Sequence, residues 1–200
     1  MCSSDLRSYI VLSGMRKAGR RIANEIIEVY NEGLDAPQTD PEFVHEVHMM
    51  QLPLRRTTFA EVASARRRIH DYLAEKPGDV DFNDAAALQV DLGILRREEL
   101  QEKMDILDTE SHILRLGTVA FATNPFELFL DYGNQIKARS YAEQTFLIQL
   151  ANGTEGYLPT EKAERGGHYS AFISSGQVGH VGGEQLVRET LKDKIGRAHV

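Results

Sequence analysis

The chain has 200 residues, of which 42% are hydrophobic, and its formal net charge is −7 at pH 7. This length and hydrophobic content are enough to build one domain with a buried core. The negative charge argues against nucleic acid or an anionic membrane surface as the main partner. No apolar run approaches the roughly 18 residues that a transmembrane helix needs, so we expect no transmembrane segment.

The two ends of the chain differ in character from the rest. Residues 1–6 (MCSSDL) and 195–200 (IGRAHV) resemble translations of the two strands of a common sequencing adapter. We therefore expect residues 7–194 to form a single partial domain of a longer protein, and we exclude both ends from the fold prediction. Cys2, the only cysteine, lies in the first of these ends, so no disulfide within the chain is expected.

The first third of the chain predicts a helix and then a strand. Apolar residues spaced three and four apart predict a helix over 15–31, with Gly33 as its end. Residues 43–54 read as a strand that ends at Pro53. His45 and His48 invite a metal interpretation, but residues three apart on a strand face opposite sides. Unless the segment is helical, these two histidines cannot bind one ion together.

Two further helices are predicted before the centre of the chain. Thr58 and Glu61 form a capping-box pair, which predicts a helix over 58–75. The residues expected to face the core in this helix are Phe59, Val62, Ala65, Ile69 and Tyr72, and Arg66, Arg67 and Arg68 are expected on a solvated face. A second helix is predicted over 84–104, with a break near Gly93.

The most regular part of the sequence predicts a strand–helix–strand unit over 118–150. Residues 119–122 and 145–150 are short apolar runs typical of buried strands. Between them, Asn124 suits a helix N-cap, Pro125 the first helical position and Glu127 a capping box, which predicts a helix over 125–138. A crossover of this length favours parallel, neighbouring strands. Residues 112–116 and 118–122 flank Gly117 closely and predict an antiparallel hairpin, so the expected fold is a mixed, layered α/β sheet with helices.

The last forty residues predict short elements. Thr160 can cap a short helix that ends at Gly166 and Gly167, and residues 168–173 alternate like a strand. A last helix is predicted over 184–194, after four glycines at 176, 179, 182 and 183. Glu184 places a negative charge where a phosphate would bind, so this glycine-rich segment is interpreted as a turn.

Polar residues follow both strands of the central unit. Thr123 and Asn124 come after the first strand, and residues 152–157 come after the second. Because the carboxyl ends of parallel strands line the ligand crevice of such sheets, we expect Asn124 and Tyr157 to approach each other at one edge. The alternative interpretation is that Asn124 is only a helix cap and Tyr157 only a packed aromatic residue.

Four segments carry a resemblance to a known family. They are GTVAFATNPFELFLDYGNQIKARS, TFLIQLANGTEGYLPTEKA, GGHYSA and GGEQLVRETLKD, and they resemble the later part of the neutral/alkaline (non-lysosomal) ceramidase family. The resemblance is best over about residues 111–191 and looser over about 9–56. It implies a zinc-dependent amidase that cleaves the amide bond of a lipid such as ceramide.

The resemblance also assigns residues. Tyr157 falls on the family's tyrosine, which implies a catalytic and zinc-binding role, and Asn124 falls on the family's glutamate ligand. Asparagine offers a neutral carbonyl oxygen, so it binds zinc more weakly than a carboxylate does. The family's histidine ligands and serine nucleophile belong to an earlier part of the protein, so the missing N-terminal part is an expected partner.

Three functional interpretations follow from these observations. In the first, the chain is part of a ceramidase-like hydrolase and is inactive by itself, with a small-molecule or lipid substrate bound by the whole protein. In the second, it belongs to a relative with an altered site, which acts on another amide or ester or only binds a ligand. In the third, it is a non-catalytic structural module.

Overall fold

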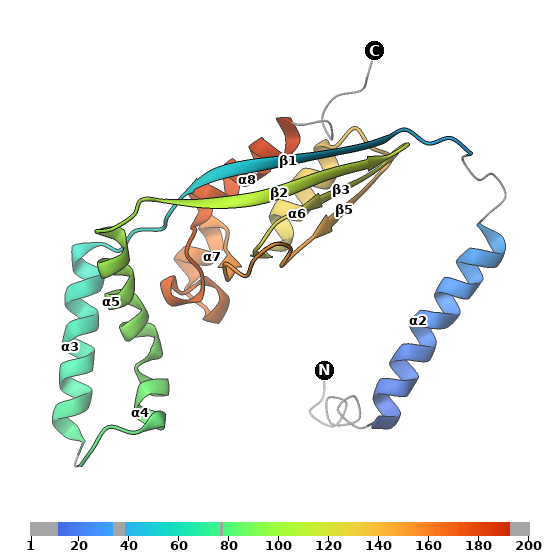
Figure 1. Cartoon of the computed structure of the whole chain (residues 1–200). Helices are drawn as coiled ribbons and strands as arrows, with labels where there is room; N and C mark the ends of the chain where they lie inside the picture. Colours follow the sequence, from blue (N-terminus) through green and yellow to red (C-terminus); the bar gives the residue numbers. More distant parts are fainter. Residues whose placement is uncertain (1–11, 34–38, 77, 193–200) are drawn as a thin grey trace. The chain divides into compact units, whose positions relative to one another are not determined.

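The computed structural model describes residues 12–33, 39–76 and 78–192 (Figure 1). Two compact units divide the chain, residues 1–41 and residues 42–200. The adapter-like ends at 1–6 and 195–200 lie outside the described residues. Helices and strands share one mixed sheet, which confirms the predicted α/β fold class. Within the described residues, no helix is both long enough and apolar enough to cross a membrane.

The described part of the first unit is mainly one helix, α2 (Leu12–Glu32), which confirms the helix predicted over 15–31. Apolar residues recur on it at helical spacing, and several of these side chains are exposed, including Met15, Ile22, Ile26 and Val29. The backbone N–H of Gly33 donates to the carbonyl of Val29 at 2.7 Å and ends the helix there.

A four-stranded sheet forms the centre of the second unit. Its strands are β1 (Phe43–Pro53), β2 (Ile106–Leu116), β3 (Val119–Thr123) and β5 (Gln144–Ile148), in the order β1-β2-β3-β5. β2 runs antiparallel to both β1 and β3, whereas β3 and β5 are parallel. The tight turn between β2 and β3 contains Gly117, whose φ of 58° suits a glycine. These pairings confirm both the predicted hairpin and the predicted parallel unit.

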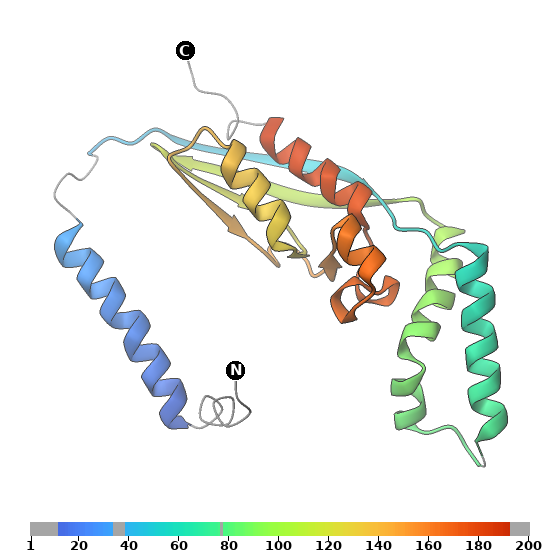
Figure 2. The same cartoon turned by 180° about the vertical axis from the view of Figure 1, so that it is seen from behind.

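Two helices cover one face of this sheet. Figure 2 shows α6 (Leu130–Arg139) and α8 (His180–Lys192) lying across it. The main hydrophobic core fills the space between them and the strands, and its fully buried members include Leu52, Phe126, Tyr132, Leu158 and Val187. Burying such side chains stabilises each by about 1.5–3 kcal/mol relative to leaving it exposed. Figure 1 looks onto the other face of the sheet, which no helix covers.

The crossover helix begins later than predicted. The expected helix over 125–138 was wrong at its start, because α6 begins at Leu130. Residues Glu127–Leu128 instead form a short strand, β4, which pairs in parallel with β6 (Tyr157–Leu158). The capping signal around Asn124 therefore serves a turn, since pairing with β6 draws the next residues into an extended conformation.

A helical hairpin joins β1 to β2. It contains α3 (Phe59–Glu75), α4 (Phe82–Ala87) and α5 (Gln89–Gln101). The capping box at Thr58 and Glu61 is present, which confirms the start of α3. Val62 and Ala65 are buried against α5, whereas the expectation that Phe59 faces the core was wrong, because its side chain is 88% exposed.

The break in the next helix also differs from the prediction. It falls at Leu88, between α4 and α5, and not at Gly93. A Cβ built on Gly93 would lie 2.1 Å from the Cβ of Ser174. This glycine therefore allows a close approach between α5 and the segment that contains Ser174.

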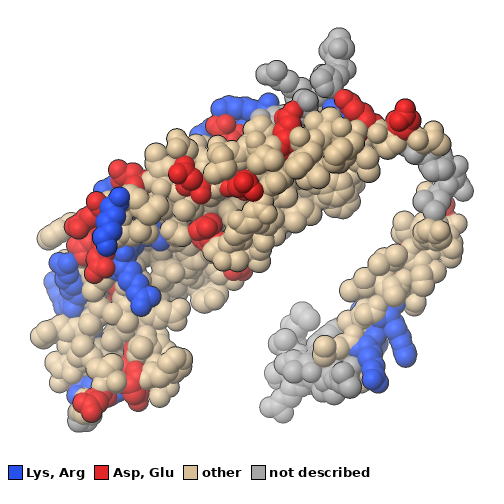
Figure 3. All heavy atoms as spheres, in the orientation of Figure 1, with Lys and Arg blue, Asp and Glu red and all other residues tan. Residues whose placement is uncertain are grey.

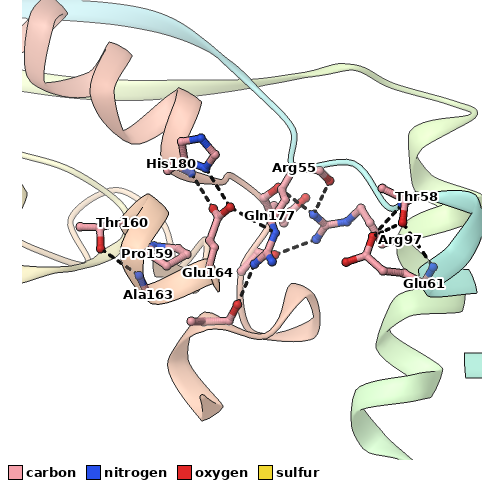
Figure 4. A network of polar contacts seen from close by, with 12 residues as sticks. Arg55, Thr58, Glu61, Arg97, Pro159, Thr160, Ala163, Glu164, Gln177 and His180 are labelled. Carbon is pink, nitrogen blue, oxygen red and sulfur yellow. Dashed lines mark hydrogen bonds and ion pairs between the residues drawn. The ribbon is translucent and has the colours of Figure 1, made fainter. Parts of the chain in front are cut away.

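A buried arginine ties the helical hairpin to the rest of the second unit (Figure 4). The guanidinium of Arg97 on α5 donates to the carbonyls of Arg55 at 3.1 Å, Gln177 at 2.7 Å and Gly176 at 2.8 Å. Burial is the main reason that the pKa of Arg97 is lowered, and the nearby charge of Arg55 lowers it further. Three carbonyl dipoles compensate this cation where no carboxylate bonds to it within the described residues.

The last part of the chain is more helical than predicted. Thr160 accepts from the N–H of Ala163 and begins α7 (Glu161–Gly166), as expected. The strand predicted over 168–173 was wrong, because this segment forms the short helices η1 (Tyr169–Ala171) and η2 (Ile173–Ser175). α8 begins at His180 instead of residue 184, so Gly182 and Gly183 lie inside it and are buried.

Candidate functional site

The candidate site lies where β3 and β5 end. The N–H of Asn124 donates to the carbonyl of Ile148 at 2.9 Å, and the N–H of Ala151 donates to the carbonyl of Asn124 at 3.0 Å. Leu150 and Asn152 have positive φ angles of 54° and 58°, so β5 stops at Ile148, earlier than predicted. The two segments that follow the strands therefore continue side by side beyond the sheet.

Asn124 lies at this edge with its side chain turned inward. Its Oδ1 accepts a hydrogen bond from the backbone N–H of Phe126 at 3.1 Å, and the residue is only 3% exposed. An Asn side chain that bonds to the backbone two residues on is typical of a turn. The amide thus stabilises the turn between β3 and β4, and its oxygen already has a donor.

Tyr157 lies on β6, directly opposite Glu127 on β4. The pKa of Tyr157 is raised, mainly by a side-chain hydrogen bond with Glu127 and further by partial burial and the negative charge of that carboxylate. The ring of Tyr169 meets the Tyr157 ring edge-on, with 5.8 Å between the ring centroids. The phenol is therefore held between a carboxylate and an aromatic ring.

Two glycines fix the backbone around Tyr157. Gly156 has a φ of 75°, and a Cβ built on Gly176 would lie 2.0 Å from the carbonyl oxygen of Tyr157. Gly156 and Gly176 also form an isolated antiparallel bridge. Larger residues at either position would displace the strand that carries Tyr157, which explains the glycines in this part of the sequence.

The structure brings Asn124 and Tyr157 to the same pair of segments, but each side chain has its own partner. Tyr157 bonds to Glu127, three residues after Asn124, whereas Asn124 bonds to Phe126. Sequence reasoning treated Glu127 as a capping residue and missed it as a site residue. A signal was present, because a carboxylate directly followed the strand whose neighbour leads to Tyr157.

His168 and His180 were two further residues that the sequence left unplaced. His168 is exposed, whereas His180 is the first residue of α8 and is held by Glu164. Glu164 accepts from the backbone N–H of His180 at 2.7 Å, and its other oxygen lies 2.8 Å from Nδ1 of the ring (Figure 4). Arg55 reaches the same carboxylate at 3.7 Å. His180 therefore belongs to an ion-pair network that joins α7 to α8.

A second polar cluster lies on the open face of the sheet. Nε2 of His45 is 2.8 Å from Nδ1 of His112, and the two rings stack. Nε2 of His112 is 2.9 Å from Glu110, and the amide nitrogen of Asn152 lies 2.7 Å from the same Glu110 oxygen. His48 instead lies 3.5 Å from Glu46, in keeping with strand alternation between His45 and His48.

The described residues do not assemble a zinc site around Tyr157. Over residues 12–33, 39–76 and 78–192, no three His, Cys, Asp or Glu side chains are arranged to hold one ion. The oxygen of Asn124 is buried and occupied, and the phenol of Tyr157 is held by Glu127 with a raised pKa, which opposes the tyrosinate form. A catalytic zinc needs about three protein ligands and an open position. This part of the chain does not fit that requirement by itself.

Comparisons with known proteins give no match: no protein-family model, no curated protein and no solved structure resembles this chain significantly.

Proposed function

We propose that this chain is the later part of the catalytic domain of a ceramidase-like hydrolase, which cleaves the amide bond of a lipid. The observation that carries the proposal is the order of two motifs, NPFE after β3 and NGTEGYLPT after β5. The segments that contain them run side by side beyond the carboxyl ends of two parallel strands. Ligands of α/β sheets commonly bind at that edge, which supports a site there.

Tyr157 is the residue to which we assign the chemistry, with Glu127 as its positioning residue. The hydrogen bond with Glu127 raises the pKa of Tyr157, so the phenol keeps its proton at neutral pH. A protonated phenol can donate a hydrogen bond to the oxygen that becomes negative when an amide carbonyl is attacked. Glu127 would accept the phenol hydrogen bond in the free protein and release it to the substrate.

The remaining parts of the proposed site come from outside this chain. Zinc is the metal that the family resemblance implies, and the histidine ligands and the nucleophile would come from the missing N-terminal part of the same protein. Asn124 is unsuited as a ligand, because its buried oxygen accepts from Phe126. We therefore expect the chain alone to bind zinc weakly and to lack ceramidase activity.

The test compares this chain with the same chain extended by the sequence that precedes it in its parent gene. Release of fatty acid from a ceramide is measured together with zinc binding by calorimetry. We expect turnover only from the extended protein, and we expect it to be lost in Tyr157→Phe but kept in Tyr169→Phe, which retains the neighbouring ring. Turnover that survives Tyr157→Phe, or stoichiometric tight zinc in the chain alone, would contradict the proposal.

One observation favours the second interpretation, a relative with an altered site. Where the family pattern has a charged ligand, Asn124 is buried and used by a turn. Such a protein would act on another amide or ester, or would only bind a ligand. If Asn124→Glu in the extended protein increased zinc affinity and ceramide turnover, the altered site would be established. A non-catalytic module would give no turnover with either residue.

A further inference from the structure

The face of the sheet opposite α6 and α8 is apolar. Side chains alternate along β1, so that Met50 and Leu52 are buried under the helices while Val47 and Met49 point to the other side. The strand register extends this face across the sheet, since Val47 pairs with His112 on β2 and Phe121 on β3 pairs with Phe146 on β5. We call the side chains on this side of the four strands the open face.

Large apolar side chains of the open face are strongly exposed. The most exposed include Phe43 (64%), Val47 (50%), Met49 (64%), Leu116 (46%), Phe146 (42%) and Ile148 (43%). The rings of Phe121 and Phe146 stack with their centroids 5.2 Å apart, so part of the surface is already ordered. Contiguous apolar patches of this kind on soluble proteins mark interaction surfaces.

The polar groups of the open face already have partners. Glu110 contacts His112 and Asn152, and Asp108 accepts from the side chain of Gln51 at 3.1 Å. These two carboxylates are the only Asp or Glu side chains that the strands place on this face. Figure 3, in the same view, shows mostly uncharged side chains over the strands. Covering the face would leave few polar groups without a hydrogen bond.

We infer that the open face is a homodimer interface, on which a second copy of this chain packs sheet against sheet about a two-fold axis. In such an interface the same patch meets itself, and packed sheets lie about 10 Å apart. With strands of five and eleven residues, the flat footprint of the face is about 500 Å² from strand spacing and rise. Projecting side chains increase the accessible area towards the roughly 800 Å² per partner of stable interfaces.

Charge is what favours a second copy as the occupant. The chain carries a net charge of −7, so two copies repel each other where their charged surfaces meet. The open face has few charges, and those are locally compensated, so contact through it keeps the acidic surfaces apart. This inference is independent of the proposed function, because it needs neither Tyr157 nor a metal.

The experiment measures the mass of the full chain in solution by light scattering and sedimentation velocity over a range of micromolar concentrations. We expect a dimer of about 45 kDa, twice the 22.5 kDa of one chain. Phe146→Lys and Val47→Lys each place a charge on the open face, and each is expected to give a monomer. Phe82→Lys is the matched control, since Phe82 on α4 is 85% exposed but lies outside the open face, and this variant should remain a dimer.

Circular dichroism of each variant establishes that it is folded, and two substitutions guard against a failure of either one. A monomeric wild-type protein at all concentrations overturns the inference, whether the open face then binds an apolar dye or is covered within the chain. A dimer that persists in folded Phe146→Lys and Val47→Lys also overturns it, because another surface would then form the contact. Loss of the dimer in both, with the control unchanged, supports it.

Discussion

Gly183 of α8 packs directly against the buried ring of Tyr132 in α6. A Cβ built on Gly183 would lie 2.4 Å from both Cζ and Oη of that ring, well inside van der Waals contact. Tyr132 is fully buried, and its hydroxyl donates to the carbonyl of Pro159 at 2.9 Å. The glycine therefore sets how closely the two helices that cover the sheet can approach each other.

The first prediction is that Gly183→Ala destabilises the protein. Although alanine favours helix, the added methyl group would force the Tyr132 ring or α8 to move, and such overpacking typically costs about 1–3 kcal/mol. Urea denaturation followed by circular dichroism measures the free energy of unfolding. Gly166→Ala is the control, because nothing lies within 4 Å of a Cβ there, and its effect should stay within about 0.5 kcal/mol. Equal stabilities of the two variants would contradict this account of the packing.

Predictions from local signals succeeded where the signal and the tertiary contacts agree. The capping box at Thr58 begins α3 as predicted, and Thr160 begins α7. At Asn124 the same kind of signal failed, because pairing of Glu127 with Tyr157 outweighs the local preference for helix. The glycines at 182 and 183 read as a turn, but α8 includes them, since packing against Tyr132 and Val178 leaves no room for side chains.

The candidate site was only partly accessible from sequence for a similar reason. Strand ends and the parallel crossover directed attention to Asn124 and Tyr157, and their segments lie at one edge of the sheet. Sequence patterns do not report where a side chain points, so the inward turn of Asn124 was not predictable. The cluster of His45 with His112 joins residues far apart in the chain and depends on the register of β1 against β2.

The second prediction concerns the pH dependence of stability. Burial is the main cause that raises the pKa of Tyr132 above its ordinary value of 10.0, with smaller contributions from Glu184, Glu164 and Asp131. The neutral phenol is favoured in the folded state, so this stability is complete below pH 10 and is lost as the pH rises above it. Unfolding then releases a proton, and the free energy of unfolding should fall by up to about 1.4 kcal/mol per pH unit above pH 10.

Tyr132→Phe isolates this contribution, because it removes the ionisable group and keeps the ring. Stability curves of the two proteins between about pH 8 and pH 11 should run parallel below pH 10 and converge above it, as the wild type alone loses the contribution of this phenol. At neutral pH the variant should be less stable by about 0.5–1.5 kcal/mol, since the bond to the carbonyl of Pro159 is lost. Curves that stay parallel through the alkaline range would contradict the prediction.

The third prediction is that Arg97→Met strongly destabilises the protein, whereas Arg96→Met does not. Arg97 is buried and donates to three backbone carbonyls, and removing it leaves those acceptors without these hydrogen bonds. A loss of about 2–4 kcal/mol is expected, from about 1–3 kcal/mol for each buried acceptor left unsatisfied, offset by the removal of a buried cation. Arg96 is exposed and should change stability by about 0.5 kcal/mol at most. Equal unfolding free energies in urea for the two variants would show that the carbonyl contacts contribute little.

The last prediction tests the local geometry of the candidate site without requiring activity. Because the hydrogen bond with Glu127 is the main cause of the raised pKa of Tyr157, Glu127→Gln should lower that pKa towards 10.0. Glutamine can still accept a hydrogen bond but carries no charge, so ionisation of the phenol is opposed less. A pH titration of ¹³C-labelled tyrosine by NMR follows this, with Tyr157→Phe to assign the signal. Glu155→Gln is the control, since Glu155 accepts from Gln177 and is not among the causes of the shift. An unchanged pKa of Tyr157 in Glu127→Gln would mean that the two side chains do not interact in solution, and Glu127 would then lose its assigned role in positioning Tyr157.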